Sequence, residues 1–439
     1  MPQTDPPPVS ASPAGEDTLH DVLIIGGGLV GASLAIALDR LGLDVGLVEA
    51  AAPGALPAVF DERNLSFAEA TVNALTALGV MQKLRAPTGA IRRIHVSRNG
   101  DFGRTVLDAA TYGRDEFGRV VIARDFGEAL EARLAELIRV RRYRPVRFVG
   151  LVDTGADTRG VRVAMRQGAE GAVEVERVLR TRLLVAADGT RSGVRAALGI
   201  DADEHDYQQT LFVTRLRCER APDGTAYERF GRDGPTALLP RGDRSYGLVH
   251  GVANDDAQAV AALDDTGFLA RVQQAFGWRA GRFLGCGPRS AYPVTRVLAQ
   301  ALTAPRAVLV GNAAQTIHPV GAQGFNLGLR DALTLAELIE AGCSQNGNDR
   351  TGFDCGVPAL LAHYAERRRE DRERTVAFSD GLARFTANES SLLRPLRSLG
   401  LFAADRLPAA QAFLVGAAMG YRGDVPALCR GDAPAEGVA

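Results

Sequence analysis

The sequence has little cysteine and no excess of charge of either sign. Five cysteines occur in 439 residues, and none belongs to a CxxC pair. An odd, scattered set argues against a disulfide framework and a zinc site, and favours a reducing, cytoplasmic location. Lysine plus arginine (51) nearly balances aspartate plus glutamate (52), and no basic run is interleaved with aromatic residues. We therefore expect neither a nucleic-acid partner nor a metal ion.

Long apolar runs are also scarce. One uncharged run, VLIIGGGLVGASLAIAL at residues 22–38, approaches the length of a membrane span. The three consecutive glycines at its centre instead favour a tight turn between a buried strand and a helix. Residues 1–20 are rich in proline and serine and carry no basic region followed by an apolar core. They predict a flexible tail rather than a signal peptide.

The glycine turn in this run has the spacing of a dinucleotide site. Gly26, Gly28 and Gly31 form G-x-G-x-x-G between an apolar strand and an amphipathic helix that is expected to end near Gly42. The first glycine permits the turn, the second lets backbone approach a pyrophosphate, and the third lets the helix pack on the strand. Glu49 ends the second strand and is expected to bind ribose hydroxyls.

Two later strand ends carry similar turns. LLVAADGTRSGVRAALGI places Asp188 and Gly189 after an apolar strand, followed by Ser192 and Arg195 at the start of a helix. Ordinary turn chemistry explains an Asp-Gly pair equally well. RAVLVGN then ends a third apolar strand at Gly311 and Asn312. A simple NAD-dependent dehydrogenase needs no such additional glycine-bearing strand ends.

The order of these segments predicts an α/β fold in which a Rossmann-like dinucleotide domain is interleaved with a mixed-sheet substrate domain and followed by a helical C-terminus. The expected parts are a tail (1–20), a first nucleotide-binding part (21–200) with a substrate-domain insertion at about 85–120, a substrate-binding sheet (201–300), a last nucleotide-binding part (301–345) and a helical region (346–439). Alternating polar and apolar residues at 140–182 and 211–249 support the two sheets.

Taken together, the three motifs resemble those of the FAD-dependent aromatic hydroxylases of the para-hydroxybenzoate hydroxylase type. Ala187 replaces the glycine that usually precedes the family's Asp-Gly pair. Asn312 stands where the family has an aspartate that contacts the flavin ribityl chain, and an amide can also bond to a hydroxyl. GNAAQTIHPVGAQGFNLGLRDA is similar to the ubiquinone-biosynthesis branch, in particular its 2-polyprenyl-6-methoxyphenol hydroxylases. The resemblance runs from about Asp21 to Tyr421.

The resemblance implies further site residues. DERNLSF, with Asp61 and Arg63, would supply Arg63 to the cofactor, and VVIARDFGEAL would supply Arg124. AYPV would place Tyr292 and Pro293 at the substrate pocket.

The loop at 309–332 would form the rim of the flavin. Its glycines, Gly324 among them, would let backbone approach a flat ring. Asn326, near a helix N-terminus, would direct N–H groups and the helix dipole at the flavin pyrimidine. His318 and Pro319 are the catalytic candidates at the flavin edge, where His318 either takes part in the chemistry or only positions the loop.

The implied function is hydroxylation of a polyprenylated phenol in ubiquinone biosynthesis through a flavin C4a-hydroperoxide, with NAD(P)H and O2 as co-substrates. The second sheet would form an apolar wall for the prenyl chain. The alternatives are a related monooxygenase acting on a soluble phenol and a non-catalytic flavin-binding subunit of a quinone-biosynthesis complex. LLRPLRSLGLFAADRLPAAQAFLVGAAMGY predicts a helical pair that packs on the core or docks peripherally on the inner face of a membrane.

Overall fold

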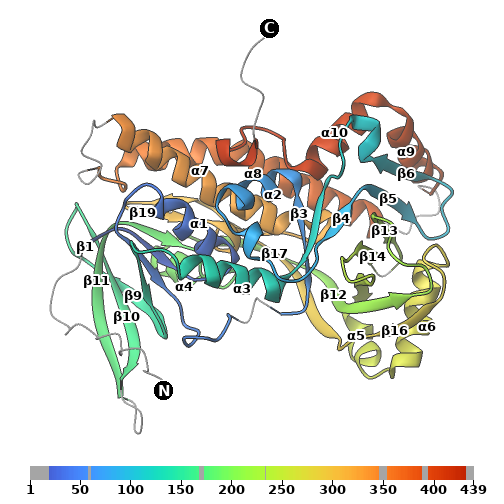
Figure 1. Cartoon of the computed structure of the whole chain (residues 1–439), viewed down its shortest axis with the longest axis horizontal. Helices are drawn as coiled ribbons and strands as arrows, with labels where there is room; N and C mark the ends of the chain where they lie inside the picture. Colours follow the sequence, from blue (N-terminus) through green and yellow to red (C-terminus); the bar gives the residue numbers. More distant parts are fainter. Residues whose placement is uncertain are drawn as a thin grey trace, which may run out of the picture.

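A computed structural model describes residues 19–57, 61–167, 173–232, 234–345, 353–387 and 394–431. Within these ranges the strands form three sheets, and the longest helices lie together along one side of the molecule (Figure 1). This mixed α/β architecture with a helical C-terminal region confirms the predicted fold class.

The first sheet contains the dinucleotide motif. Its strand order is β18-β19-β11-β1-β2-β8, and β10 and β9 extend from β11. Its strands are β1 (Leu19–Ile25), β2 (Val45–Val48), β8 (Val140–Tyr143), β9 (Val146–Val152), β10 (Arg159–Gln167), β11 (Val173–Ala186), β18 (Thr303–Ala304) and β19 (Ala307–Leu309). The pairs β19–β11, β11–β1, β1–β2 and β2–β8 are parallel, whereas β9, β10 and β11 form an antiparallel meander.

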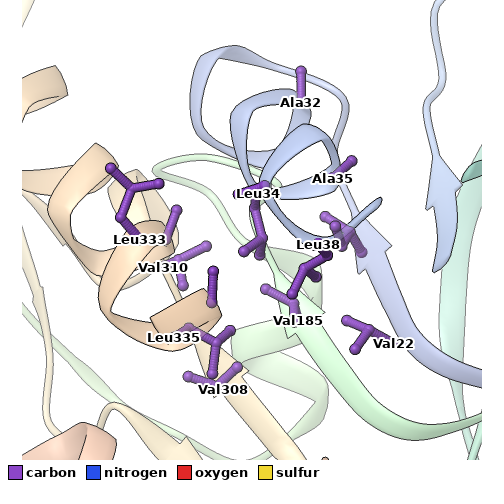
Figure 2. Close-up of a cluster of buried hydrophobic side chains, with 14 of the residues drawn as sticks. Val22, Ala32, Leu34, Ala35, Leu38, Val185, Val308, Val310, Leu333 and Leu335 are labelled. Atoms are coloured by element: carbon purple, nitrogen blue, oxygen red, sulfur yellow. The ribbon is translucent and has the colours of Figure 1, made fainter. Parts of the chain in front are cut away.

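The parallel strands form because they are apolar on both faces. Val22, Leu23 and Ile24 in β1 are completely buried, as expected for a parallel strand that is covered on both sides. Figure 2 shows Leu34 and Leu38 of helix α1 (Leu29–Asp39) in the same cluster as Val22, with Val185 of β11, Val308 of β19 and Leu333 of helix α7 (Gln323–Gln345). Burial of this cluster fixes α1 and α7 against the sheet.

The second sheet is larger and mostly antiparallel. Its strand order is β20-β17-β12-β15-β14-β13-β5-β6, with β16 also paired to β12. Its strands are β5 (Arg93–Arg98), β6 (Arg104–Asp108), β12 (Ala202–Cys218), β13 (Thr225–Phe230), β14 (Pro235–Pro240), β15 (Tyr246–Ala253), β16 (Phe283–Cys286), β17 (Ser290–Ala299) and β20 (Gln315–Thr316). Segment 85–120 contributes β5 and β6 to this sheet, so the chain leaves the first sheet and joins the second.

A small third sheet and the helices complete the architecture. The third sheet has the order β3-β7-β4, with β3 (Asn64–Ala68), β4 (Gly89–Ile91) and β7 (Gly118–Ile122). The helices are α1 (Leu29–Asp39), α2 (Glu69–Ala77), α3 (Ala123–Leu134), α4 (Gly193–Ala197), α5 (Asn254–Ala261), α6 (Asp265–Phe276), α7 (Gln323–Gln345), α8 (Pro358–Ala387), α9 (Arg394–Arg406) and α10 (Pro408–Met419). None of the helices in the described ranges is long and apolar enough to cross a membrane.

Two boundaries differ from the predicted ones. Strand β1 begins at Leu19, inside the predicted tail, because the buried His20 ring is held by Asp44 and by the Tyr143 hydroxyl, which lies 2.7 Å from Nε2. The rest of the tail, residues 1–18, lies outside the described residues. Helix α1 ends at Asp39 with Arg40 as its C-cap, so Gly42 lies in the following turn, where it adopts a φ of +81°.

A buried ionic network joins α7 to α8. The Arg368 side chain is fully buried and donates from Nε to Asp331 Oδ1 at 2.7 Å and from Nη2 to Asp371 Oδ2 at 2.8 Å. Arg330 donates to both oxygens of Asp371. Burial alone would raise the pKa of Asp371, but Arg330 and Arg368 lower it to about 2. Because each buried charge has a partner, loss of any one of them leaves another uncompensated.

Candidate active site

The three glycine-bearing loops lie along one edge of the first sheet. Strands β19, β11, β1 and β2 are parallel neighbours, and Leu309, Ala186, Ile25 and Val48 are aligned in register near their carboxyl ends. The loops that follow these strands therefore emerge side by side. Ligands of open α/β sheets bind in the crevice outside the carboxyl ends of the strands.

Glycine at the first turn is required by close packing. A Cβ atom at Gly31 would lie 2.0 Å from the carbonyl oxygen of Gly26, and one at Gly26, where φ is +108°, would lie 2.4 Å from the carbonyl oxygen of Ala187. Helix α1 starts after Gly28 without a side-chain cap and without an acidic residue in its first turn. Its first N–H groups and positive dipole end are thus available to an anion.

Glu49 lies directly after β2, beside this turn. Its Oε2 accepts from the N–H of Gly27 at 2.8 Å, and its Oε1 accepts from the N–H of Ala51 at 2.7 Å. A carboxylate has further acceptor capacity, so these bonds hold Glu49 in place while leaving lone pairs for a hydroxyl.

The Asp188 carboxylate is engaged within its own loop. It accepts from Ser192 Oγ at 2.5 Å and from the N–H of Val194 at 3.1 Å, so it stabilises the start of α4. Gly189 has a φ of +87°, and a Cβ built there meets no atom within 4 Å. Arg195, also buried, donates to the carbonyl of Ala313 at 2.9 Å and ties this loop to the next one.

The third loop is held from behind by Asp331. The N–H of Gly311 donates to Asp331 Oδ2 at 3.1 Å, and Gly311 has a φ of +59°. A Cβ at Gly311 would lie 2.9 Å from a methyl group of Val30, so this loop and the first turn pack directly on each other. Asn312 is exposed at this edge. Sequence reasoning assigned no role to Asp331, which couples the loop to the buried ionic network.

The His-Pro step is anchored on both sides. His318 is buried, its Nδ1 accepts from the N–H of Val320 at 3.1 Å, and its carbonyl accepts from Ser379 Oγ at 2.7 Å. Its ring stands edge-on to Tyr207, with 4.8 Å between the ring centroids. Burial lowers the pKa of His318 to about 4. The ring is therefore neutral near pH 7, and its contacts favour a positioning role over proton transfer. Pro319 is exposed next to it.

The start of α7 combines a strained turn with an asparagine whose side-chain hydrogen-bonding groups are all used. Gly321 and Ala322 have φ values of +70° and +52°, which is costly for the alanine. A Cβ at Gly324 would meet nothing within 4 Å. The Asn326 side chain accepts from Ala68 N and Thr71 Oγ1 and donates to two carbonyls. All four of its hydrogen-bonding positions are used, so α7 can reach a ligand here only through its backbone N–H groups.

Arg63 and Tyr292, which are far apart in sequence, form one cluster. The Arg63 guanidinium lies 4.3 Å from the centre of the Tyr292 ring and donates twice to Asp61 at 2.8 Å. The Tyr292 hydroxyl also donates to Asp61. Burial alone would raise the pKa of Asp61, but the bonds from Arg63 and Tyr292 lower it. Neighbouring Pro293 is exposed and pairs with Thr210 of β12.

Arg124 lies at the surface. Its guanidinium Nε is 3.1 Å from Glu62 Oε1, and both side chains are more than half exposed. Its backbone N–H donates to the carbonyl of Asp61 at 2.9 Å. The structure thus places Arg124 beside the segment that carries Arg63, with its side chain in a weak, solvent-screened pair.

A small cavity, partly open to solvent, lies between the His-Pro loop and the second sheet. Its lining is Gln209, Gly231, Gly234, Pro235, His318, Val320 and Ala383. Gln209 follows a β-bulge in β12, where Gln208 adopts a φ of +56°, and its Oε1 lies 3.4 Å from His318 Nε2. Bulges commonly redirect a side chain next to an active site. Because a bulge is set by strand pairing, sequence reasoning did not find Gln209.

These features fit a flavin dinucleotide. A capless helix start at Gly28 suits a pyrophosphate, Glu49 suits a ribose, and open space next to Gly189 and Gly324 leaves room for a large planar group. Asn312 is exposed next to Gly311 and offers an uncharged amide.

Comparison with known proteins agrees with this geometry. Residues 20–379 match a family model described as an FAD binding domain. The chain is similar to the ubiquinone hydroxylase UbiL of Rhodospirillum rubrum, with 34% identity covering 95% of this chain and 93% of that protein. It is 29% identical to 3-demethoxyubiquinol 3-hydroxylase of Escherichia coli, covering 88% and 95%. The fold resembles that of p-nitrophenol 4-monooxygenase PnpA from Pseudomonas putida, with a TM-score of 0.74, 18% identity and coverage of 93% and 99%.

The fold and site define a flavoprotein monooxygenase. The chain belongs to the FAD-binding family that includes the ubiquinone hydroxylases, and it is an FAD-dependent aromatic hydroxylase. The family expected from the sequence is thereby confirmed. NAD(P)H is the typical reductant of this family, and a phenolic ring and O2 are the substrates that such a hydroxylase requires.

The glycine turn offers a direct test of cofactor binding. We expect Gly31→Ala to weaken FAD binding about tenfold or more, because its Cβ would collide with the Gly26 carbonyl and displace the turn. Gly400→Ala in α9, where a Cβ meets nothing within 4 Å, is the matched control and should keep its flavin. Absorbance of the folded protein at the flavin bands measures both. Full flavin occupancy in Gly31→Ala would contradict this assignment.

Because His318 is buried in its neutral form, we expect the free energy of unfolding to fall as the pH is lowered. Its pKa is about 4 in the folded state and 6.5 ordinarily, so the stability contribution is complete above about pH 6.5 and is lost as the pH falls toward 4. Between pH 7.5 and 5 the loss from this residue should be about 2 kcal/mol. Urea unfolding at the two pH values should show a smaller loss in His318→Asn. An equal loss in the variant would show that His318 is not the titrating group.

Proposed function

We propose that this protein hydroxylates the ring of a polyprenylated phenol in ubiquinone biosynthesis, using FAD, NAD(P)H and O2. The observation that supports this most is the cavity between the His-Pro loop and the second sheet, lined mainly by glycine, proline, valine and alanine. The names of its relatives, ubiquinone hydroxylase and 3-demethoxyubiquinol 3-hydroxylase, point to the same substrate class.

The proposed cofactor contacts follow the edge of the first sheet. When bound, FAD supplies the activation of O2 and the transfer of one oxygen atom to the ring. Gly26, Gly28 and Gly31 let the α1 N-terminus approach the pyrophosphate, and Glu49 binds ribose hydroxyls.

The later loops would hold the rest of the cofactor. Asn312 and the loops at Gly189 and Gly311 border the ribityl chain, and Asp188 acts by shaping its loop. Arg63, oriented by Asp61, faces the cofactor from the domain junction, with Arg124 farther out.

The chain orients the phenol from the other side. His318 Nε2 carries the ring hydrogen, because Nδ1 accepts from Val320, and faces Gln209 Oε1. The Gln209 amide is thereby held with its N–H group able to donate to the phenol oxygen. Pro319 limits the backbone freedom of the loop, and the apolar lining of the cavity excludes water from the reacting ring. Tyr292 and Pro293 would line the approach along β17.

Substrate-stimulated oxidation of NAD(P)H tests the proposal. We expect a prenylated phenol to accelerate oxidation and to become hydroxylated, with simple phenols far less effective. Gln209→Leu should raise KM about tenfold, the loss of one hydrogen bond to substrate, whereas Gln258→Leu, exposed on α5, should leave it unchanged. Equal use of soluble phenols would indicate the related monooxygenase. FAD-loaded protein that fails to oxidise NAD(P)H, whichever phenol is added, would indicate a non-catalytic subunit.

We further propose that the C-terminal helices dock on an anionic membrane surface. Leu399, Phe402, Leu407 and Phe413 are each about half exposed in α9, in α10 and between them. Arg406 lies over the Phe402 ring, 5.1 Å from its centre, so a cationic group accompanies the exposed apolar side chains. Such a face binds anionic lipid while the substrate's prenyl chain stays in the bilayer.

Point substitutions test this face better than a deletion. Val415 and Met419 of α10 are buried in the core, so removing α9 and α10 would destabilise the fold. We expect Phe402→Asp with Leu407→Asp to abolish sedimentation with phosphatidylglycerol vesicles. Trp278→Asp, at an exposed position far along the chain, should leave sedimentation unchanged. If the doubly substituted protein sediments normally, the face has another occupant, such as a protein of a quinone-biosynthesis complex.

A further inference from the structure

A second cavity lies outside the proposed substrate site, where α7, α8 and α10 meet. It is small and partly open to solvent. The polar residues that line it are Gln323, Arg330, Asp371, Arg374, Thr375 and Arg422. Figure 1 shows α7 and α8 side by side, with α10 near their end. Gln323 and Arg330 come from the segment 311–332, but none of the residues to which the sequence assigned a site role lines this cavity.

Positive charge exceeds negative charge in this cavity. Three guanidinium groups face it, and among the described residues that line it Asp371 carries the one carboxylate. Both Asp371 oxygens are already used, by Arg330 at 2.7 and 3.0 Å and by the fully buried Arg368 at 2.8 Å. The hydrogen bonds of Asp371 therefore go mainly to Arg330 and Arg368, and its charge offsets only part of the repulsion between Arg374 and Arg422.

Arg422 is positioned to bind an anion through its edge. Its guanidinium lies face-on over the Phe413 ring, 3.6 Å from the ring centre. Stacking uses the flat face of the group and leaves its in-plane N–H donors for a second partner. Burial, and then the charge of Arg374, lower the pKa of Arg422. An anion bound between the two arginines would stabilise the charged form of Arg422 and so raise its pKa again.

Arg374 approaches the cavity from α8. It is about half exposed and is paired with Glu370 one helical turn earlier, which is more than half exposed. Such a surface pair is weak and can rearrange at small cost. The Thr375 hydroxyl donates to Asp371 Oδ1 at 3.3 Å. Gln323 Nε2 bonds to the carbonyls of Gly321 and Ala417, which ties the cavity wall to the loop at the start of α7.

We propose that this cavity binds a phosphate monoester group, held by Arg374 and Arg422. Arg422, together with Arg374 once it exchanges its surface pair with Glu370 for the ligand, matches the charge of about −1.5 to −2 that a phosphate monoester carries at pH 7. The guanidinium fork also matches the oxygen geometry of the phosphate. The group belongs either to a free phosphate compound or to the headgroup of phosphatidic acid at a membrane.

Isothermal titration of the FAD-loaded full chain tests the site, with inorganic phosphate at constant ionic strength as the probe. We expect saturable binding that weakens at least tenfold in the double variant Arg374→Gln, Arg422→Gln. Arg422→Lys keeps the charge but not the planar fork, so its phosphate affinity should lie between those of the unchanged protein and the double variant. Arg369→Gln is the matched control, because Arg369 lies on the same helix, exposed and paired with Glu366 outside the cavity.

Vesicles distinguish the two sources of phosphate. If a headgroup is the ligand, phosphatidic acid in phosphatidylcholine should retain the protein more strongly than phosphatidylglycerol at equal charge, and the double variant should lose this difference. If a free compound is the ligand, inorganic phosphate binds but retention is the same in both proteins. Far-UV circular dichroism and flavin content confirm that the variants are folded. The proposal is overturned if neither probe binds, or if binding is unchanged in the folded double variant.

Discussion

The parallel alignment of β19, β11, β1 and β2 is the constraint on which the site depends. Where these strands pair in parallel they are apolar on both faces, so they must be buried between helices, and their carboxyl ends meet at one edge. Three loops separated by more than a hundred residues from one another in sequence thereby become neighbours. Glycine is then a packing requirement, because a Cβ at Gly26 or Gly311 would collide with the adjacent loop and one at Gly31 would collide with the Gly26 carbonyl of its own turn.

The ionic network behind the third loop connects that loop to helices α7 and α8 in the C-terminal half of the chain. Asp331 accepts from the N–H of Gly311 and from Arg368, so the same carboxylate fixes the loop and joins α7 to α8. Such a network is costly to bury but specific in geometry, since every member must find its partner. The site, the helical layer and the second cavity are therefore parts of one connected framework.

Much of this arrangement follows from local patterns in the sequence. The G-x-G-x-x-G turn, Glu49 at the end of β2 and the three strand-ending loops are encoded within short segments, so they could be predicted. The Asp61–Arg63–Tyr292 cluster, the bulge that directs Gln209 and the saturation of Asn326 by β3 and α2 depend on contacts between distant segments. Periodicity and spacing contain no information about such contacts. The start of β1 was misplaced for the same reason, because His20 is buried by partners on other strands.

Because the three loops and the start of α7 lie together, one cofactor should contact all of them at once. Hydrogen–deuterium exchange of the protein without and with FAD measures this directly. Protection should increase together at residues 26–31, 187–195, 310–313 and 320–326, while the peripheral strands β5 and β6 stay unchanged. Protection limited to the first turn, or located mainly on the second sheet, would contradict the account.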